Sequence, residues 1–230
     1  MSNKPLLVVL SGAGISAESG IKTFRDANGL WDNHRIEDVA SPHGFLNNTA
    51  LVHDFYNQRR AQALKCEPNA GHLGLVDLEK EFDVVVVTQN VDGLHEKAGS
   101  KTVIHLHGEL SKASCMDEYC GYVEEIGDAP MFEDELCPHG HMKRPFIVWF
   151  GEDVPKLQEA ADWIRKAEYV VIIGTSLQVY PAAGLLYEAR PDAVVYYIDP
   201  NPAPTPSHIT IIPEGAGKGV AILKEFLGVE

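Results

Sequence analysis

The chain has few cysteines, few basic residues and no long apolar run. Four cysteines in 230 residues are too few for a disulfide scaffold, and three of them lie close together. The 19 basic side chains are outnumbered by 33 acidic ones, which disfavours nucleic acid and anionic membrane surfaces as partners. No stretch approaches the roughly 20 apolar residues that cross a bilayer, and the run 6–10 is too short for a signal peptide. We therefore expect a cytoplasmic protein without a membrane segment, and a monomer.

What is present is an ordinary globular composition, with 45% hydrophobic and 23% charged residues. The net charge of −14 is unevenly distributed, because eight acids and no Lys or Arg lie between Cys115 and Cys137. Such a charge favours cationic partners, for example lysine-rich polypeptides.

Four apolar runs predict strands that are buried on both faces. Each run stops at small or polar residues, as in an open parallel sheet whose ligand lies beyond the carboxyl ends of the strands. The runs cover residues 6–10, 83–88, 169–173 and 193–198. The expected fold class is α/β, with a Rossmann-like parallel sheet.

Apolar residues recur at helical spacing after Pro155, which predicts a helix there, and the run Val220 to Leu227 can form a closing helix. Two stretches interrupt the alternation of strands and helices, and we expect them to form a smaller module. One is helical (about 26–67) and the other contains the cysteines (about 111–143). The chain 1–230 would then be a single domain, whose Rossmann-like core covers about 1–25, 68–110 and 144–230.

A glycine turn, Gly12-Ala13-Gly14, follows the first predicted strand. Glycines in this position let the backbone approach a phosphate closely, but a plain tight turn has the same spacing. Gln89, Asn90 and Asp92 follow the second strand, where exposed polar side chains are more often ligand contacts than packing residues.

Six motifs follow one another along nearly the whole chain: GAGISAESGIKTFR (12–25), GLW (29–31), TQNVDGLH (88–95), HLHG (105–108), VWFGE (148–152) and GTSL (174–177). Together, and in this order, these blocks resemble the sirtuins, a family of NAD-dependent lysine deacylases. One departure is Thr23, where many members carry an acid.

The resemblance implies an NAD site at the strand ends. The pyrophosphate contacts would be Gly12, Ala13 and Gly14, assisted by Ser16 and Arg25. Phe24 would screen the ribose, although core packing is the alternative for this side chain. Thr23 in the same block and Trp31 in the next block would also contact the cofactor. Gln89, Asn90 and Asp92 would bind the ribose and the nicotinamide carboxamide. The adenosine half would contact Gly174, Thr175, Ser176, Asn201 and Ala216.

His107 is the expected general base. The implied reaction needs a group that takes a proton from a ribose hydroxyl, and an imidazole with a pKa near ~6.5 suits this task at neutral pH. The family motif selects the histidine before Gly108, so His105 is the second choice.

The resemblance also implies that the segment 148–152, which has strand propensity, pairs with the substrate backbone through Val148, Phe150, Gly151 and Glu152. Val179 would flank the other side of the substrate.

Two side chains on a predicted helix over 49–64 indicate which class of acyl group the protein would remove. Tyr56 and Arg59 share one face of this helix and could together grip a carboxylate. Alternatively Arg59 extends to solvent or pairs with a local acid, and Arg60 competes for the role. Tyr-x-x-Arg resembles the sirtuin subclass that removes succinyl, malonyl or glutaryl groups, and acetyl-lysine should also be accepted.

Sirtuins commonly carry a structural zinc ion. Here Cys115, Cys120 and Cys137 are followed by His139 and His141, so three sulfurs and one imidazole could form a closed tetrahedral site. Either histidine could be the fourth ligand. The alternative is a degenerate insertion with reduced cysteines and no metal.

The resemblance leaves two other functions open. One is protein mono-ADP-ribosylation with the same co-substrate, and the other is a non-catalytic NAD-binding module. A hydride-transfer Rossmann enzyme lacks support, because Gly12-x-Gly14 does not continue into the usual glycine. Acylated lysines of proteins are the expected partners.

Overall fold

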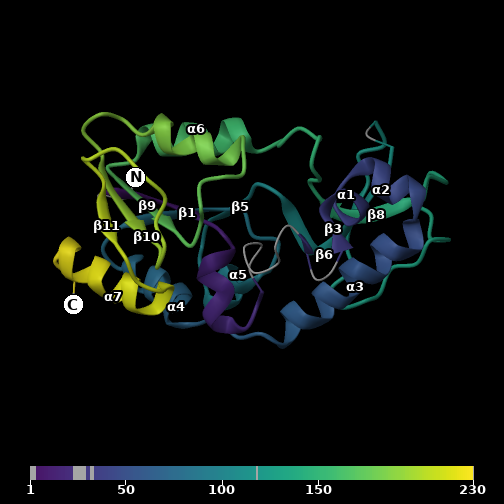
Figure 1. Ribbon diagram of the computed structural model, residues 1–230, viewed down its shortest axis with the longest axis horizontal. Helices are drawn as coiled ribbons and strands as arrows, with labels where there is room; N and C mark the ends of the chain where they lie inside the picture. Colours follow the sequence, from purple (N-terminus) through teal and green to yellow (C-terminus); the bar gives the residue numbers. More distant parts are fainter. Residues whose placement is uncertain (1–3, 23–29, 32–33, 118, 230) are drawn as a thin grey trace.

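The protein is described by a computed structural model that covers residues 4–22, 30–31, 34–117 and 119–229. Figure 1 shows a parallel sheet flanked by helices at one end of the molecule and a smaller module at the other.

The larger part contains a six-stranded, fully parallel sheet in the order β11-β10-β9-β1-β4-β5. Its strands are β1 (Leu6–Ser11), β4 (Asp83–Thr88), β5 (Val103–His105), β9 (Tyr169–Ile173), β10 (Val194–Ile198) and β11 (Thr210–Ile212). Side chains alternate between the two faces, so each central strand contributes to two separate cores. Val8 and Leu10 lie in one core, whereas Leu7 and Val9 lie in the other.

Helices cover both faces of the sheet (Figure 1). α6 (Leu157–Lys166) and the 3₁₀ helix η3 (Ala182–Glu188) pack on one face, and α4 (Ala70–Leu78) and α7 (Ala216–Leu227) pack on the other. Two shorter elements follow strand ends: the 3₁₀ helix η1 (Ala13–Ser19) after β1, and α5 (Leu94–Ala98) after β4. This arrangement places the loops after β1, β4, β9 and β10 at one edge of the sheet.

The smaller module is built from two regions of the chain. The first contributes β2 (Leu30–Trp31), β3 (His34–Arg35), α1 (Ile36–Val39), α2 (Pro42–Asn47) and α3 (Thr49–Lys65). The second contributes an antiparallel sheet, β7-β6-β8, formed by β6 (Gly108–Cys115), β7 (Val123–Glu125) and β8 (Lys143–Ile147). This sheet uses residues on both sides of the boundaries expected at 110 and 144. The two regions share an apolar core that includes Phe45, Tyr56 and Trp149.

The four predicted strands are present, but the sheet has two more. β5 and β11 are three residues long and form its edges, so their apolar runs are too short to stand out. α7 begins at Ala216, four residues before the predicted start. Gly217 and Gly219 obscure its first turn in the sequence, and Gly219 is needed because a Cβ there would collide with Ile198.

The segment 148–152 follows β8, which ends at Ile147, and its pairing with a substrate backbone stays a prediction. The chain then turns, with Gly151 at φ +92° and the Glu152 N–H donating to the Trp149 carbonyl. Among the described residues, no helix has both the length and the apolar character required to cross a membrane.

Candidate active site

The glycine turn after β1 is packed against the end of β9. The Gly12 N–H donates to the Ile173 carbonyl (3.0 Å), and the Gly14 N–H donates to the Gly174 carbonyl (2.7 Å). A Cβ on Gly14 would lie 2.6 Å from the Gly174 Cα, so glycine is required for this close approach. Contacts of these residues with phosphates stay a prediction.

Polar side chains from three strand-end loops meet beside this turn. The Asn90 amide donates to the Ser16 hydroxyl (3.2 Å), and that hydroxyl donates to the Asp92 carboxylate (3.0 Å). The Gln89 amide reaches the Thr175 hydroxyl (3.2 Å), which connects the loop after β4 to the loop after β9. Burial raises the pKa of the Asp92 carboxyl, although the Leu94 N–H and Ser16 oppose this shift.

His105 is the last residue of β5 and His107 lies two residues beyond it, but the two rings differ in their protonation. The His107 Nδ1 faces the Gln89 carbonyl at 3.0 Å, and a carbonyl can only accept, so the proton of the neutral ring lies on Nδ1 and the lone pair on Nε2. Burial lowers the pKa of His107. The His105 Nδ1 likewise donates to the Asn90 carbonyl (2.9 Å), but its Nε2 lies 2.7 Å from the Glu96 carboxylate. Burial lowers the pKa of His105, yet Glu96 outweighs this effect and the pKa is raised. His107 therefore suits the role of a base better than His105.

Gly108 allows the chain to turn immediately after His107. It has φ +84°, and any Cβ would collide with the Phe146 carbonyl. The Val148 N–H donates to the His107 carbonyl (2.9 Å), so the predicted substrate segment is bonded directly to the predicted base.

The substrate segment is held by its own side chains and by Arg144. The guanidinium donates to both oxygens of Glu152 (2.5 and 2.9 Å) and to the Ile147 carbonyl, and it stacks 3.6 Å from the centre of the Trp149 ring. The Trp149 N–H also donates to Glu152. Both carboxylate oxygens of Glu152 therefore bond within the protein, whereas the Phe150 side chain is 49% exposed. Val179 is half-buried in the loop after β9.

Arg59, and not Arg60, reaches the site. Arg59 lines a cleft together with residues of β6 and of the polar loop after β4 (residues 89–92). Its guanidinium lies 5.1 Å from the centre of the Phe55 ring. Arg60 is not among the residues that line this cleft and donates to the carbonyls of Leu110 and Ala129. The cleft is lined by Ile21, Arg59, Gln62, Ala63, Val91, Asp92 and Leu110. Tyr56 is fully buried, and its hydroxyl oxygen accepts from the Trp149 indole N–H (3.0 Å).

The remaining predicted residues lie around the same edge of the sheet or outside the description. Ser176 is half-buried after β9, and Asn201 is exposed after β10. Ala216 is buried at the start of α7. Thr23, Phe24 and Arg25 lie outside the described residues, as does the side chain of Trp31.

Comparison with known proteins identifies the family. The model of the Sir2 family matches residues 12–181. The NAD-dependent protein deacylase of Bacteroides thetaiotaomicron is 52% identical over 227 residues, which cover 96% of this chain and 97% of that protein. The corresponding deacylase of Helicobacter pylori (strain 26695) is 52% identical over 217 residues, covering 91% and 92%. A crystal structure of a Sir2 homologue with NAD superposes with a TM-score of 0.86 at 34% identity, covering 98% of this chain and 91% of that one.

The chain belongs to the Sir2 family.

The residues at the sheet edge fit a dinucleotide, as expected of a Sir2 protein. Asn90, Asp92 and Thr175 are each less than 10% exposed and converge beside the glycine turn at the carboxyl ends of parallel strands. Buried side chains that can donate or accept hydrogen bonds in such a crevice are suited to sugar hydroxyls and a carboxamide.

The cysteine cluster of this Sir2 chain has the spacing of a tetrahedral metal site. With bonds of about 2.3 Å to sulfur and 2.1 Å to nitrogen, ligands lie about 3.8 Å (S to S) and about 3.6 Å (S to N) apart. The sulfur of Cys137 lies 3.7 Å from that of Cys115 and 3.8 Å from that of Cys120, and the Cys115 sulfur lies 3.5 Å from the His141 Nδ1. These four residues could hold a metal ion.

His139, the first candidate for the fourth ligand, is not a member of this group. Its Nδ1 lies 3.0 Å from the Cys120 sulfur, which is a hydrogen-bonding distance and shorter than the expected ligand spacing. His141 takes the fourth position because the turn at Gly140 brings its ring back to Cys115.

Sequence reasoning missed a buried hydroxyl network behind the polar loop. Ser11 at the end of β1 bonds to the Thr88 hydroxyl and to the His95 ring, both at 2.9 Å. The signal in the sequence is that the first two apolar strands, β1 and β4, each end in a hydroxyl residue.

Proposed function

We propose that this Sir2-family chain is an NAD-dependent protein deacylase in which His107 is the general base. The observation that carries the proposal is the geometry of His107: its Nδ1–H is fixed on the Gln89 carbonyl, so Nε2 is the basic nitrogen. The lowered pKa keeps the ring neutral at physiological pH, as a base requires. The deacylases named in the comparison share about half of their residues with this chain, which supports the same activity here.

NAD, when bound, supplies a ribose carbon from which nicotinamide can leave. The protein's part is to orient the co-substrate through Asn90, Asp92 and Thr175 and to accept a proton from a ribose hydroxyl at His107 Nε2. The bond from Val148 to the His107 carbonyl keeps the segment that would hold the substrate backbone in register with the base. The products would be nicotinamide, O-acyl-ADP-ribose and free lysine.

The test is an assay with NAD and matched acetyl-lysine and succinyl-lysine peptides, in which the products are identified by mass. His107→Ala should lower turnover by about 10²- to 10⁴-fold and leave NAD binding by calorimetry nearly unchanged. A wild-type protein that binds no NAD, or an alanine variant with full turnover, would contradict the proposal. ADP-ribose attached to protein without O-acyl-ADP-ribose would instead indicate mono-ADP-ribosylation.

We further propose that acidic acyl groups, succinyl and malonyl, are preferred over acetyl. Arg59 lines the same cleft as Asp92, so a guanidinium faces the space next to the polar loop. Tyr56 lies one turn away on α3, and burial raises its pKa, so the hydroxyl stays protonated. A guanidinium with a neighbouring neutral hydroxyl is suited to an acyl carboxylate.

Arg59→Met tests the acyl preference. Because a hydrogen bond to a charged group contributes about 1.5–3 kcal/mol, kcat/KM for the succinyl peptide should fall by roughly 10- to 100-fold, with little change for the acetyl peptide. Gln62→Met is the matched control, since Gln62 lines the same cleft without a charge. Equal losses with both peptides would contradict the preference and leave the deacylase assignment intact.

A further inference from the structure

The loop after β4 is joined carbonyl by carbonyl to the segment that carries the predicted base. The Gln89 carbonyl accepts from His107, the Asn90 carbonyl accepts from His105, and the Val91 carbonyl accepts from the Leu110 N–H (2.8 Å). Three consecutive peptide planes are thereby oriented by β5, by the turn that follows it, and by β6. The loop's geometry therefore depends on this second segment.

The His105 bond differs from its neighbours because it carries charge. Glu96 lies 2.7 Å from the His105 Nε2, and an ionised carboxylate there requires a proton on that nitrogen. With Nδ1 also donating, His105 is an imidazolium, and a charged donor makes a stronger hydrogen bond to the Asn90 carbonyl than a neutral one. Glu109 also faces this ring, but its carboxylate is paired with Lys112 at 2.8 Å.

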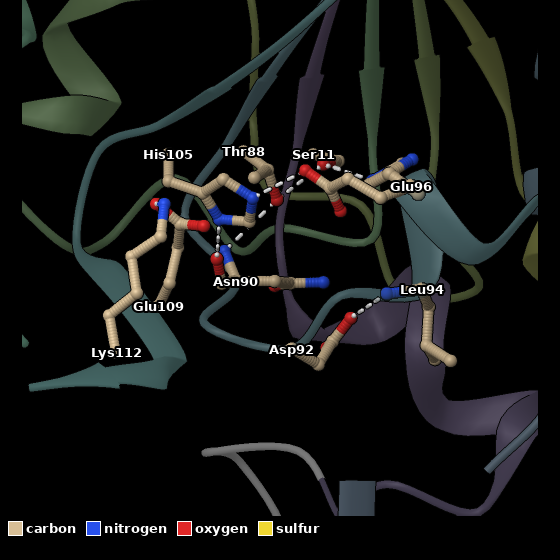
Figure 2. A network of polar contacts seen from close by, with 10 residues as sticks. Ser11, Thr88, Asn90, Asp92, Leu94, Glu96, His105, Glu109 and Lys112 are labelled. Atoms are coloured by element: carbon tan, nitrogen blue, oxygen red, sulfur yellow. Dashed lines mark hydrogen bonds and ion pairs between the residues drawn. The ribbon is translucent and has the colours of Figure 1, made fainter. Parts of the chain in front are cut away.

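These bonds connect the loop after β4, His105 and α5 to one another in a ring of contacts (Figure 2). Glu96 lies in α5, the helix that directly follows the loop, and the Leu94 N–H of that helix donates to Asp92 (3.1 Å). Glu96 holds His105, and His105 holds the Asn90 carbonyl at the start of the same loop. The Asn90 N–H donates to Thr88 (3.0 Å) and its side chain donates to Ser16 (3.2 Å), so the His105 bond is the one that fixes the carbonyl side of this residue.

We propose that the His105–Glu96 ion pair is a positioning device that fixes the Asn90 peptide and, through it, the side chains of Asn90 and Asp92 toward the co-substrate. The proposal rests on the proposed function, because it assigns the pair a role in binding NAD. Without the His105 donor, the buried Asn90 carbonyl would lack this partner and the peptide would turn to find another. The bond between His107 and the Gln89 carbonyl is separate and would remain.

Two substitutions at His105 separate the two bonds. The His105→Asn amide nitrogen occupies the place of Nδ1, so it can still donate to Asn90 but cannot reach Glu96. The His105→Gln amide extends to the place of Nε2, so it can still contact Glu96 but releases Asn90. Glu96→Gln keeps a hydrogen-bonding partner for His105 and removes the charge. Both His105 variants lose the ion pair, so they provide matched controls for each other in stability.

We expect His105→Gln to raise the KM for NAD by about ten-fold or more, with the KM for the acyl peptide unchanged. His105→Asn should stay within about three-fold of wild type, and Glu96→Gln, which keeps both bonds without the charge, should fall between wild type and His105→Asn. Equal effects of the Asn and Gln variants on the KM for NAD, following their melting temperatures, would overturn the proposal, because a merely structural pair would behave in this way.

Hydrogen exchange gives a readout that does not require activity. The amides of residues 91–94 should exchange faster in His105→Gln than in His105→Asn, and unchanged exchange in both would overturn the proposal. Calorimetry of NAD binding to wild type separates the two claims. A wild type that binds no NAD would contradict the proposed function and, with it, the role of the pair in co-substrate binding. The exchange data would still test whether the pair positions the loop.

Discussion

The two sides of the candidate site are held by different kinds of interaction. On the sheet side, the loop 89–92 is held mainly through its own backbone, whose carbonyls and N–H groups bond to strand ends and to two histidines. On the module side, the segment 148–152 is held by charged and aromatic side chains, with Arg144 against Trp149 and Glu152. The cysteine cluster, whose four residues could hold a metal ion, lies in the same module. The sheet side is therefore fixed by the fold itself, whereas the module side depends on a few contacts between charged and aromatic side chains.

Removing metal should break the module side most severely. If the cluster binds zinc, chelation or Cys137→Ser should remove on the order of 10 kcal/mol of stabilisation from the module, because a structural zinc ion contributes directly to folding. Hydrogen exchange should then show lost protection in β6 and β8 and retained protection in β1, β4 and β9. Metal analysis should find one zinc ion per chain.

Cys66→Ser is the control for this experiment, because Cys66 lies outside the cluster and donates to the Gln62 carbonyl. It should keep the metal and the module. Purified protein that contains no zinc, with a module unaffected by a chelator, would show that the cluster is structural without a metal.

Arg144→Met should have the next largest effect. It leaves the Glu152 carboxylate without its cationic partner, and loss of one member of a buried pair costs about 3 kcal/mol. We expect that loss in urea unfolding, together with a rise in the KM for the peptide and little change in the KM for NAD. Arg165→Met is the control, since Arg165 pairs with Asp162 and Glu188 on the surface and should cost below about 1 kcal/mol. Equal rises in both KM values would show that the two sides are not held independently.

Most of the sheet side could be predicted from the sequence because its signals are local. The block Val84 to Val87 is apolar at every position, as a central parallel strand requires, and the polar residues that follow it are placed by the end of the strand. The three-residue edge strands escaped detection because an edge needs only a short apolar run. The charge of His105 also escaped, since it depends on Glu96 in a separate element.

The module side could be predicted only in outline. The helix with Tyr56 and Arg59 was evident from its spacing, but its buried face also includes His53 and Arg60, which the stripe did not indicate. The bond from Trp149 to Tyr56 joins residues 93 positions apart, and no spacing rule reaches that far. The choice between His139 and His141 depends on distances of a few tenths of an ångström, so it required coordinates.

The buried histidines behind the sheet side predict a dependence of stability on pH. Burial lowers the pKa of His72 to about 4 and that of His95 to about 3, so both rings fold in the neutral form. Between pH 6.5 and pH 4 the unfolded chain therefore binds more protons at these two histidines than the folded protein does. Their contribution is therefore complete above pH 6.5 and is lost as the pH falls toward the folded values.

At about 1.4 kcal/mol for each pKa unit, each of the two rings should cost about 3 kcal/mol of unfolding free energy between pH 6.5 and pH 4, or about 6 kcal/mol for both. His72→Gln should flatten this dependence and keep the cap of α4, because Gln can accept from the Asn69 N–H as His72 does. His53 and His107, whose pKa values are also lowered, add to the slope in both proteins. A wild-type slope near zero in urea unfolding would refute this account.

The smallest expected effect concerns the hydrogen bond between Trp149 and Tyr56, which joins the segment 148–152 to α3 on the module side. Trp149→Phe keeps an aromatic ring beneath Arg144 but removes the indole N–H that donates to the Tyr56 hydroxyl oxygen. That donor limits how the Tyr56 hydroxyl can rotate, so its loss should weaken the hold on an acyl carboxylate by about 1 kcal/mol. We expect the ratio of succinyl to acetyl kcat/KM to fall by about five-fold. Trp163→Phe, on α6 and remote from the cleft, should leave the ratio unchanged. A ratio that is unchanged in Trp149→Phe but falls in Arg59→Met would assign the selection to the guanidinium alone, and the tryptophan would then serve only to pack the substrate segment.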